Sequence, residues 1–80
     1  MSLPKILIVE DESIVALDLK TRLSRLGYEV VGTVASGNEA LRLTELFRPD
    51  IALMDIHLNG SMDGIETAAK LRAEFNTPVV

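Results

Sequence analysis

Acidic residues stand at the ends of two apolar, strand-like runs. The run "IALM" is followed by Asp55, and the run "KILIV" is followed by Glu10, Asp11 and Glu12. Removing an unpaired charge from water costs several kcal/mol unless a partner compensates it. The position of Asp55 therefore indicates a function, and its partners are sought among the other acidic residues.

Carboxylates that meet at one edge of a sheet predict a metal site. Like charges held close together raise each other's pKa, and a hard divalent cation removes that conflict. Mg²⁺ prefers octahedral oxygen coordination and keeps part of its water shell, which suits carboxylates and a backbone carbonyl. Beside such a cation, a carboxylate oxygen can attack a phosphoryl group. We therefore expect Asp55 to face Glu10 and Asp11, with a metal between them.

Ordinary structural roles compete with this interpretation. Acidic residues after a strand commonly begin the next helix, where its dipole favours them, and this suits Glu12 and competes for Asp11. Asp63 is interpreted as a helix cap. Asp55 does not fit such a role, because the segment "IHLNGSM" separates it from the next helix. His57 is the only histidine and has no second His or Cys at ligand spacing, so its ring is interpreted as an ordinary loop side chain.

The composition excludes several other classes of function. The 80 residues carry a formal net charge of −4, which gives no basic surface for nucleic-acid phosphates or an anionic membrane. Cysteine is absent, so neither a disulfide framework nor a thiolate metal site is present. No apolar run approaches the roughly 20 residues of a membrane span, and "MSLPK" does not have the pattern of a signal peptide. We expect a cytoplasmic protein whose residues 1–80 form a single domain.

Strand-like and helix-like patterns alternate along the chain. Strands are predicted at "KILIVE", "YEVVGTV" and "IALMDI", and "TPVV" begins a fourth. Apolar residues spaced three and four apart predict a helix between each pair of strands. The predicted stripes are Val15, Leu19, Leu23 and Leu26 in the first helix, Ala40, Leu43, Leu46 and Phe47 in the second, and Ile65, Ala68, Leu71 and Phe75 in the third.

Capping residues support the predicted ends of the helices. Gly27 follows the first stripe, where a C-terminal cap needs a positive φ. Ser36 and Glu39 have the spacing of a capping box, and Pro49 stops the helix that they begin.

The order βαβαβαβ predicts an α/β fold. Such alternation favours a doubly wound parallel sheet, with helices on both faces and right-handed crossovers. Sites in these folds lie beyond the carboxyl ends of the strands. In a flavodoxin-like sheet, with the order 2-1-3-4-5 in the complete domain, the first and third strands are neighbours. Glu10 and Asp11 would then meet Asp55 at one edge.

Five segments together resemble the response-regulator receiver domains of two-component signalling. They are "KILIVEDE", "ASGNEAL", "RPDIALMDIHL", "MDGIETA" and "TPVV", in family order along almost the whole chain. The resemblance implies that Asp55 accepts a phosphoryl group from a histidine kinase or phosphotransfer protein. It also implies that Asp11 binds Mg²⁺ directly, that Glu10 acts through water or as a weaker partner, and that His57 offers only its backbone carbonyl.

The sequence departs from the family pattern in two places. Many receivers have a proline four residues after the acceptor, whereas Asn59, Gly60 and Ser61 precede "MDG" here. The family also has a Ser or Thr ending the fourth strand and a Lys ending the fifth, and the sequence stops at Val80 before either. We therefore expect the native gene to continue for about 40 residues, from the ~100–150-residue norm for domains.

Two other functions are weighed against a phosphoacceptor. A degenerate receiver could act only as a protein-binding module, but that role would not require Glu10, Asp11 and Asp55 together. A phosphohydrolase of the haloacid dehalogenase type needs a second Asp two residues after the nucleophile, where this chain has His57. The segment could also belong to a hybrid histidine kinase or precede an effector domain, and the sequence does not distinguish these contexts.

Overall fold

Three parallel strands form the sheet, in the order β2-β1-β3. The computed structural model describes residues 3–54 and 64–80, so the predictions for Asp55, His57 and Asp63 lie outside the described residues. The strands are β1 (Lys5–Val9), β2 (Glu29–Val34) and β3 (Ile51–Met54), and the helices are α1 (Ser13–Arg25), α2 (Gly37–Phe47) and α3 (Gly64–Phe75). The alternation predicted from the sequence is confirmed, and the predicted ends that fall on described residues differ from the observed ones by one or two residues.

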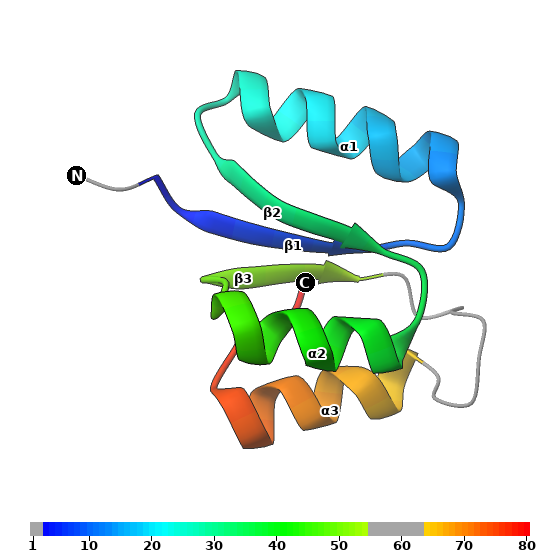
Figure 1. Cartoon of the computed structure of the whole chain (residues 1–80), viewed down its shortest axis with the longest axis vertical. Coiled ribbons are helices and arrows are strands. Elements are labelled where there is room, and N and C mark those ends of the chain that lie inside the picture. The colour runs from blue at the N-terminus through cyan, green and yellow to red at the C-terminus, as the bar shows by residue number, and fades with distance from the viewer. Residues whose placement is uncertain (1–2, 55–63) are drawn as a thin grey trace.

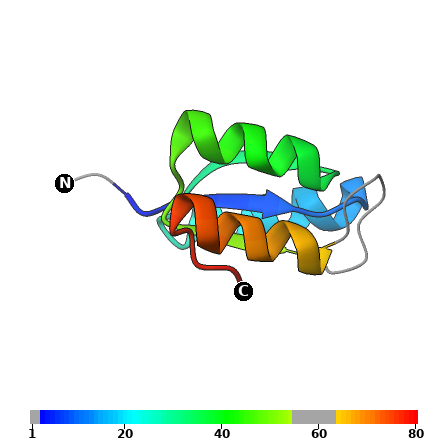
Figure 2. The same cartoon turned by 90° about the horizontal axis from the view of Figure 1, so that it is seen from below.

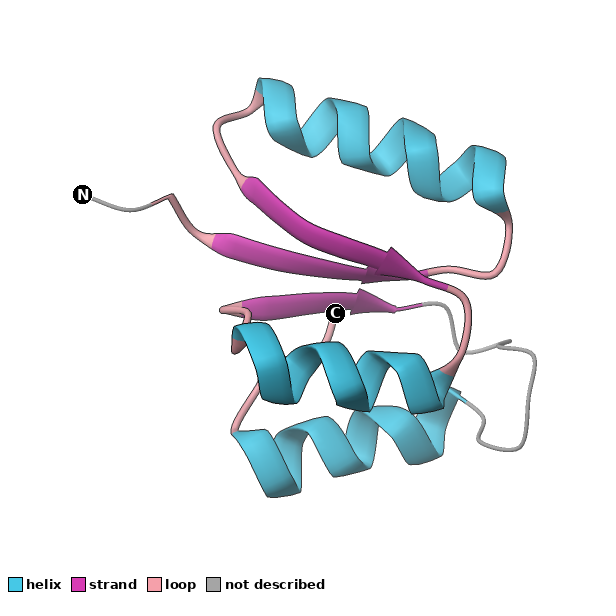
Figure 3. Cartoon of the chain, in the orientation of Figure 1, coloured by secondary structure: helices cyan, strands magenta, loops and turns pink. Residues whose placement is uncertain are grey.

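The sheet is covered by helices on both faces, as expected for a doubly wound fold (Figure 1). Alternate residues of β1 point to opposite faces: Leu7 and Val9 pack in the cluster beneath α2 and α3, whereas Ile6 and Ile8 pack with Ala16 of α1. Colouring by secondary structure shows α1 alone on one side of the strands (Figure 3). The view turned by 90° shows α2 and α3 side by side across the other face (Figure 2). The continuous apolar run of β1 is therefore explained by burial on both faces.

The predicted fourth strand is present as a single parallel bridge beside β3. Val79 pairs with Ala52. The Ala52 N–H donates to the carbonyl of Pro78 at 2.9 Å, and the Val80 N–H donates to the carbonyl of Ala52 at 2.9 Å. These bonds place residues 78–80 on the outer side of β3, which agrees with the flavodoxin-like order 2-1-3-4.

The outermost strand β2 contains a bulge. Ile6 pairs with Val30, but Leu7 pairs with Gly32, so Val31 is an extra residue in β2. Gly32 stands where the sheet approaches α2 closely, because a Cβ built on it would lie 2.7 Å from Leu43 Cδ1. A glycine is the residue that fits this position without displacing Leu43.

Local capping follows the sequence signals. Ser36 Oγ accepts a hydrogen bond from the Glu39 N–H at 3.3 Å and donates to Glu39 Oε1 at 3.2 Å, so the predicted cap of α2 is confirmed. Gly27 has a φ of 94°, as its place after α1 predicts. Arg48 ends α2 in the left-handed region with a φ of 49°, directly before Pro49. The helices α1 and α2 thus end at or near the residues where their sequence signals predict an end.

The predicted stripe of α1 is only partly correct. Leu19 and Leu23 pack against the sheet, but Leu26 is 73% exposed and Val15 is 38% exposed. Ala16 is the buried residue of this helix. Among the described elements this helix packs mainly on β1 and β2, and a narrow line of residues at spacings of three and four faces the strands. A small alanine begins that line in place of Val15.

The contact face of α2 contains small buried residues beside Leu41 and Leu43. Ala40 and Thr44 are completely buried, whereas Leu46 is 65% exposed and Phe47 is 45% exposed. The prediction that Leu46 lies in the core is therefore wrong. The helix packs against α3 as well as the sheet, and small side chains allow that close approach.

The same correction applies to α3. Leu71 is completely buried and Ala68 is 9% exposed, but Ile65 is 70% exposed. Phe75 packs at the margin of the core, and the Arg48 guanidinium lies 5.0 Å from the centre of its ring. The α3 face that packs on α2 and the sheet thus contains Ala68 and Leu71 but not the predicted Ile65.

These two residues of α3 give a direct test of the packing. Leu71→Ala should lower the free energy of unfolding by about 2–5 kcal/mol, because it opens a cavity in a filled core. Ile65→Ala, the matched control on the exposed face, should change it by no more than about 0.5 kcal/mol. Urea unfolding of the intact protein measures both. An Ile65→Ala variant as unstable as Leu71→Ala would contradict the orientation of α3.

Candidate functional site

The carboxyl ends of the three strands lie at one edge of the sheet. Val9, the last residue of β1, pairs with Val34 at the end of β2 and with Met54 at the end of β3. All pairings are parallel, so the chain leaves each strand at this same edge. In open α/β sheets such an edge, beside a reversal of strand order, is where ligands bind.

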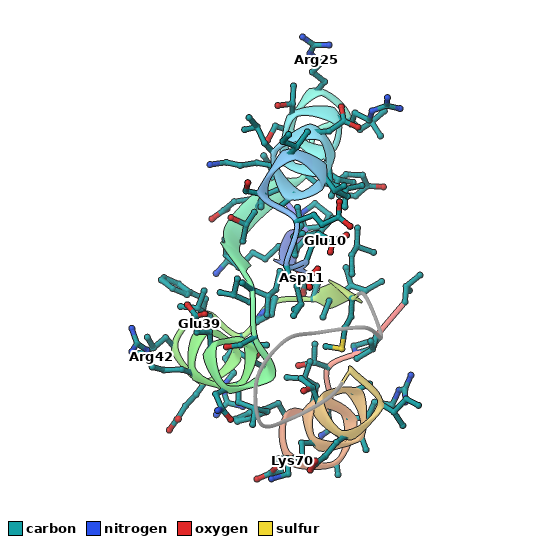
Figure 4. The ribbon with its side chains drawn as sticks, turned by 90° about the vertical axis from the view of Figure 1, so that its right-hand side faces the viewer. Glu10, Asp11, Arg25, Glu39, Arg42 and Lys70 are labelled. Atoms are coloured by element: carbon teal, nitrogen blue, oxygen red, sulfur yellow. The ribbon has the colours of Figure 1, made fainter. Side chains whose placement is uncertain are left out.

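Two of the predicted acidic residues lie at this edge. Glu10 and Asp11 follow β1 directly and are both half-buried. Figure 4 shows them together, between the start of α1 and the end of β3, while Arg25, Arg42 and Lys70 lie on the outer surfaces of the helices. Glu10 and Asp11 therefore lie at the carboxyl edge of the sheet, and their predicted meeting with Asp55 stays a prediction.

Backbone hydrogen bonds fix the start of this turn. The Glu10 N–H donates to the carbonyl of Val34 at 2.9 Å, which extends the pairing of β1 and β2 by one residue. Glu10 Oε2 accepts a hydrogen bond from the Glu12 N–H at 3.4 Å. The Glu10 side chain is thus directed toward the first residues of α1.

A surface cavity of about 240 Å³ adjoins the acidic pair on the α1 side. It lies between α1 and the end of β2, and it combines the two carboxylates with an ammonium group and two hydroxyls. Its lining residues are Glu10, Asp11, Ser13, Ala16, Leu17, Lys20, Thr33, Val34 and Ala35. The acidic pair is therefore open to solvent and to small ligands from this side.

A second cavity, of about 450 Å³, lies over the ends of β1 and β3. It is lined by Val9, Glu10, Leu19, Leu53, Met54 and Val80. Glu10 lines both cavities. Among the described residues that line the second cavity, Glu10 has the ionisable side chain, and the others have apolar side chains.

The described residues supply part of a site for a hard cation. Carboxylate oxygens are the ligands that Mg²⁺ prefers, and Glu10 and Asp11 offer two carboxylates at one edge. Among residues 3–54 and 64–80, no group of three His, Cys, Asp or Glu residues is placed to hold a metal. The further predicted ligands, Asp55 and the His57 carbonyl, lie outside the described residues. The chemistry of the donors present fits Mg²⁺.

The sequence profile of the response regulator receiver domain matches residues 6–80. This chain belongs to the response regulator receiver family. The resemblance drawn from its motifs is thereby confirmed, and so is the flavodoxin-like α/β fold.

Curated relatives of this receiver domain are regulators of greater length. The transcriptional regulatory protein PdtaR of Mycobacterium tuberculosis is 38% identical over 76 residues, which cover 95% of this chain and 37% of PdtaR. The phyllosphere-induced regulator PhyR of Methylorubrum extorquens is 35% identical over 77 residues, which cover 95% of this chain and 29% of PhyR. The receiver domain thus spans about a third of each of these relatives.

Solved structures show the same fold. The signal receiver domain of a modulated diguanylate cyclase from Desulfovibrio desulfuricans G20 is 50% identical, with a TM-score of 0.93 over 98% of this chain and 62% of that chain. The response regulator PhyR from Brucella abortus is 33% identical, with a TM-score of 0.90 over 99% of this chain and 32% of that chain.

The structure adds one residue that the sequence reasoning missed in this receiver domain. Lys20 lines the first cavity together with Glu10 and Asp11. Ser13, Ala16 and Lys20 are spaced three and four apart, so helical periodicity from Ser13 already places them on one face of α1.

Within the described ranges, no helix has the length and hydropathy that a membrane span requires.

Proposed function

We propose that this receiver domain accepts a phosphoryl group on Asp55, from a histidine kinase or a phosphotransfer protein. The observation that supports the proposal is the parallel pairing of β1 with β3. Its register sets Val9 beside Met54, so the residue that precedes Asp55 in the sequence lies at the same edge of the sheet as Glu10 and Asp11. Membership of the receiver family supports the same assignment.

In this proposal the acidic edge holds Mg²⁺. Asp11 binds the ion directly, Glu10 acts through water or as a weaker partner, and Asp55 and the backbone carbonyl of His57 complete the protein ligands. The bound ion supplies positive charge that neutralises the phosphoryl oxygens during transfer. These protein ligands would hold the ion beside the Asp55 carboxylate.

The transfer itself is a displacement at phosphorus. A carboxylate oxygen of Asp55 attacks the phosphorus of a phosphohistidine, and a P–O bond forms as the P–N bond breaks. The electron pair of the broken bond stays on the imidazole nitrogen of the donor, which then takes up a proton. The product is an acyl phosphate on Asp55, so the chain acts as a phosphoprotein in a relay.

The partners proposed here are proteins. PdtaR is described as a transcriptional regulator, and PhyR from Bartonella quintana, an anti-anti-sigma factor, forms a complex with the anti-sigma factor NepR. A receiver of this kind passes its phosphorylation state to an effector domain or a partner protein. With a formal net charge of −4, this segment itself is proposed to contact neither nucleic acid nor a membrane.

Phosphorylation of Asp55 is tested with a small phosphodonor. Asp55→Asn should abolish the mass increase that acetyl phosphate and Mg²⁺ produce in the intact protein, because the amide has lost the nucleophilic oxygen and its charge. Asp18→Asn is the matched control, since Asp18 makes an exposed ion pair with Arg22 at 3.1 Å on α1. Intact-protein mass spectrometry measures the product. Labelling that persists in Asp55→Asn would rule out this acceptor, and a parent that takes up no label would favour a binding module.

The role of His57 is tested by removing its ring. If only the backbone carbonyl binds the metal, His57→Ala should leave the affinity for Mg²⁺ within a few-fold of the parent. A calorimetric titration with Mg²⁺ measures this affinity. A loss of about 10- to 100-fold, typical of damage to the support of a metal site, would show that the ring contributes.

A further inference from the structure

The outer side of α1 carries large apolar residues that the fold leaves exposed. Ile14 is 83% exposed and Leu17 is 64% exposed, and they are about one helical turn apart. Ile14 is the most exposed large hydrophobic residue that the structure describes. Figure 1 shows α1 as the outermost layer on its side of the sheet, so this surface is open to another molecule.

Helical periodicity places these apolar residues on one face with polar neighbours. Successive residues turn by about 100° around the helix axis, so the positions opposite the line of Ala16, Leu19 and Leu23 form a single outward line. We call this line the outer α1 face, and its residues, all exposed, are Ile14, Leu17, Asp18, Thr21 and Arg25. Figure 4 shows Arg25 directed away from the sheet at the end of α1.

The polar residues of the outer α1 face allow another helix to approach closely. The Thr21 hydroxyl donates to the Leu17 carbonyl at 3.0 Å, so its hydrogen bond is made within the helix. Asp18 and Arg22 form an exposed ion pair at 3.1 Å along the flank of this face. A second helix that covers the face therefore does not strand the Thr21 hydroxyl without a partner.

Charge is divided unevenly along α1. Glu12, directly before the helix, and Asp18 lie toward its start, whereas Arg22 and Arg25 lie in its last turn. Two copies of α1 packed antiparallel set the acidic half of each against the basic half of the other, and the two helix dipoles oppose each other. Parallel packing would set like charges together. The outer α1 face is therefore complementary to itself about a two-fold axis.

We infer that this protein forms a homodimer by antiparallel packing of the outer α1 faces of two copies. A two-fold axis between Asp18 and Thr21 brings Ile14 of each copy beside the last turn of the other, where the aliphatic part of Arg25 covers it. A pair of 13-residue helices buries less than the ~1,200 Å² at which standard interfaces begin, so the dimer is weak and forms at high concentration. This inference does not rest on the proposed function.

Sedimentation velocity tests the dimer and its apolar contact. The intact protein, without metal or phosphodonor, should shift from monomer to dimer between about 10 µM and 1 mM. Ile14→Ser should raise the dissociation constant at least about tenfold, because two-fold symmetry removes the side chain from both halves of the interface. Ile65→Ser is the matched control, since Ile65 is a comparably exposed isoleucine (70%) on α3 and its loss should leave the constant unchanged.

The charges give an independent readout. Arg25→Glu should weaken the dimer by a similar factor, whereas Arg42→Glu, on the outer surface of α2, should not. Raising NaCl from about 50 to 500 mM should also weaken the parent dimer, because salt screens exposed charges. A dimer insensitive both to salt and to Arg25→Glu would overturn the inference, because the division of charge is what sets the antiparallel direction.

Disulfide cross-linking tests the direction of packing. The chain contains no cysteine, so a single introduced cysteine reports on one position. Thr21→Cys lies near the proposed axis and should cross-link two copies under mild oxidation. Ile14→Cys should not, because a rise of 1.5 Å per residue sets the two copies of this position roughly 16 Å apart along the helices, beyond the reach of a disulfide.

Three other results would overturn the inference. A protein that stays monomeric up to about 1 mM would leave the outer α1 face to a different partner protein. A dimer that Ile14→Ser does not weaken would place the contact on another surface. Cross-linking of Ile14→Cys in preference to Thr21→Cys would show parallel packing.

Discussion

The parallel pairing of β1 with its two neighbours is the constraint on which this structure depends. Leu7, Ile8 and Val9 are completely buried, so β1 must have apolar cover on both faces and a strand on each side. A shift of one residue in its register with β3 would turn the side chains of that strand to the opposite faces. The register therefore fixes the two cores and, with them, the level at which the strands end. The strand already fixes the backbone that leads into the acidic residues after it. Holding these residues at the carboxyl edge of the sheet therefore costs little further chain entropy.

The strand pattern could be predicted from the sequence because burial on both faces leaves a continuous apolar run, as in "KILIV". The orientation of the helices could be predicted only in part. The spacing of apolar residues identifies a stripe, and the prediction took the large apolar residues as the buried ones. Where elements pack closely, small residues are buried in their place. Ala16 and Thr44 lie in the contact faces, while Leu46 and Ile65 point outward. Which of two neighbouring helix residues is buried depends on how closely the helix approaches the sheet and the next helix. The local sequence pattern does not determine that distance.

The same distinction applies to the site. The types and positions of Glu10 and Asp11 predict that they share an edge, because the direction of a parallel strand decides where its end lies. The hydrogen bond from the Glu12 N–H to Glu10 depends on the backbone angles of the turn and on one side-chain rotamer, so it could not be predicted. Lys20 lines a cavity together with the acidic pair because α1 packs beside the end of β2, and that packing is a long-range contact. The roles of Asp55 and His57 stay predictions, and they are supported by the strand that leads into them.

The bulge at Val31 has a consequence for how copies of this protein behave toward one another. A flat edge strand offers evenly spaced N–H and C=O groups, which another chain can use as a template for unwanted sheet growth. One extra residue in β2 breaks that even spacing and increases the local twist. A straight strand from a second molecule cannot match both halves of β2 in one register. The irregularity beside Gly32 thus also opposes edge-to-edge aggregation of the sheet.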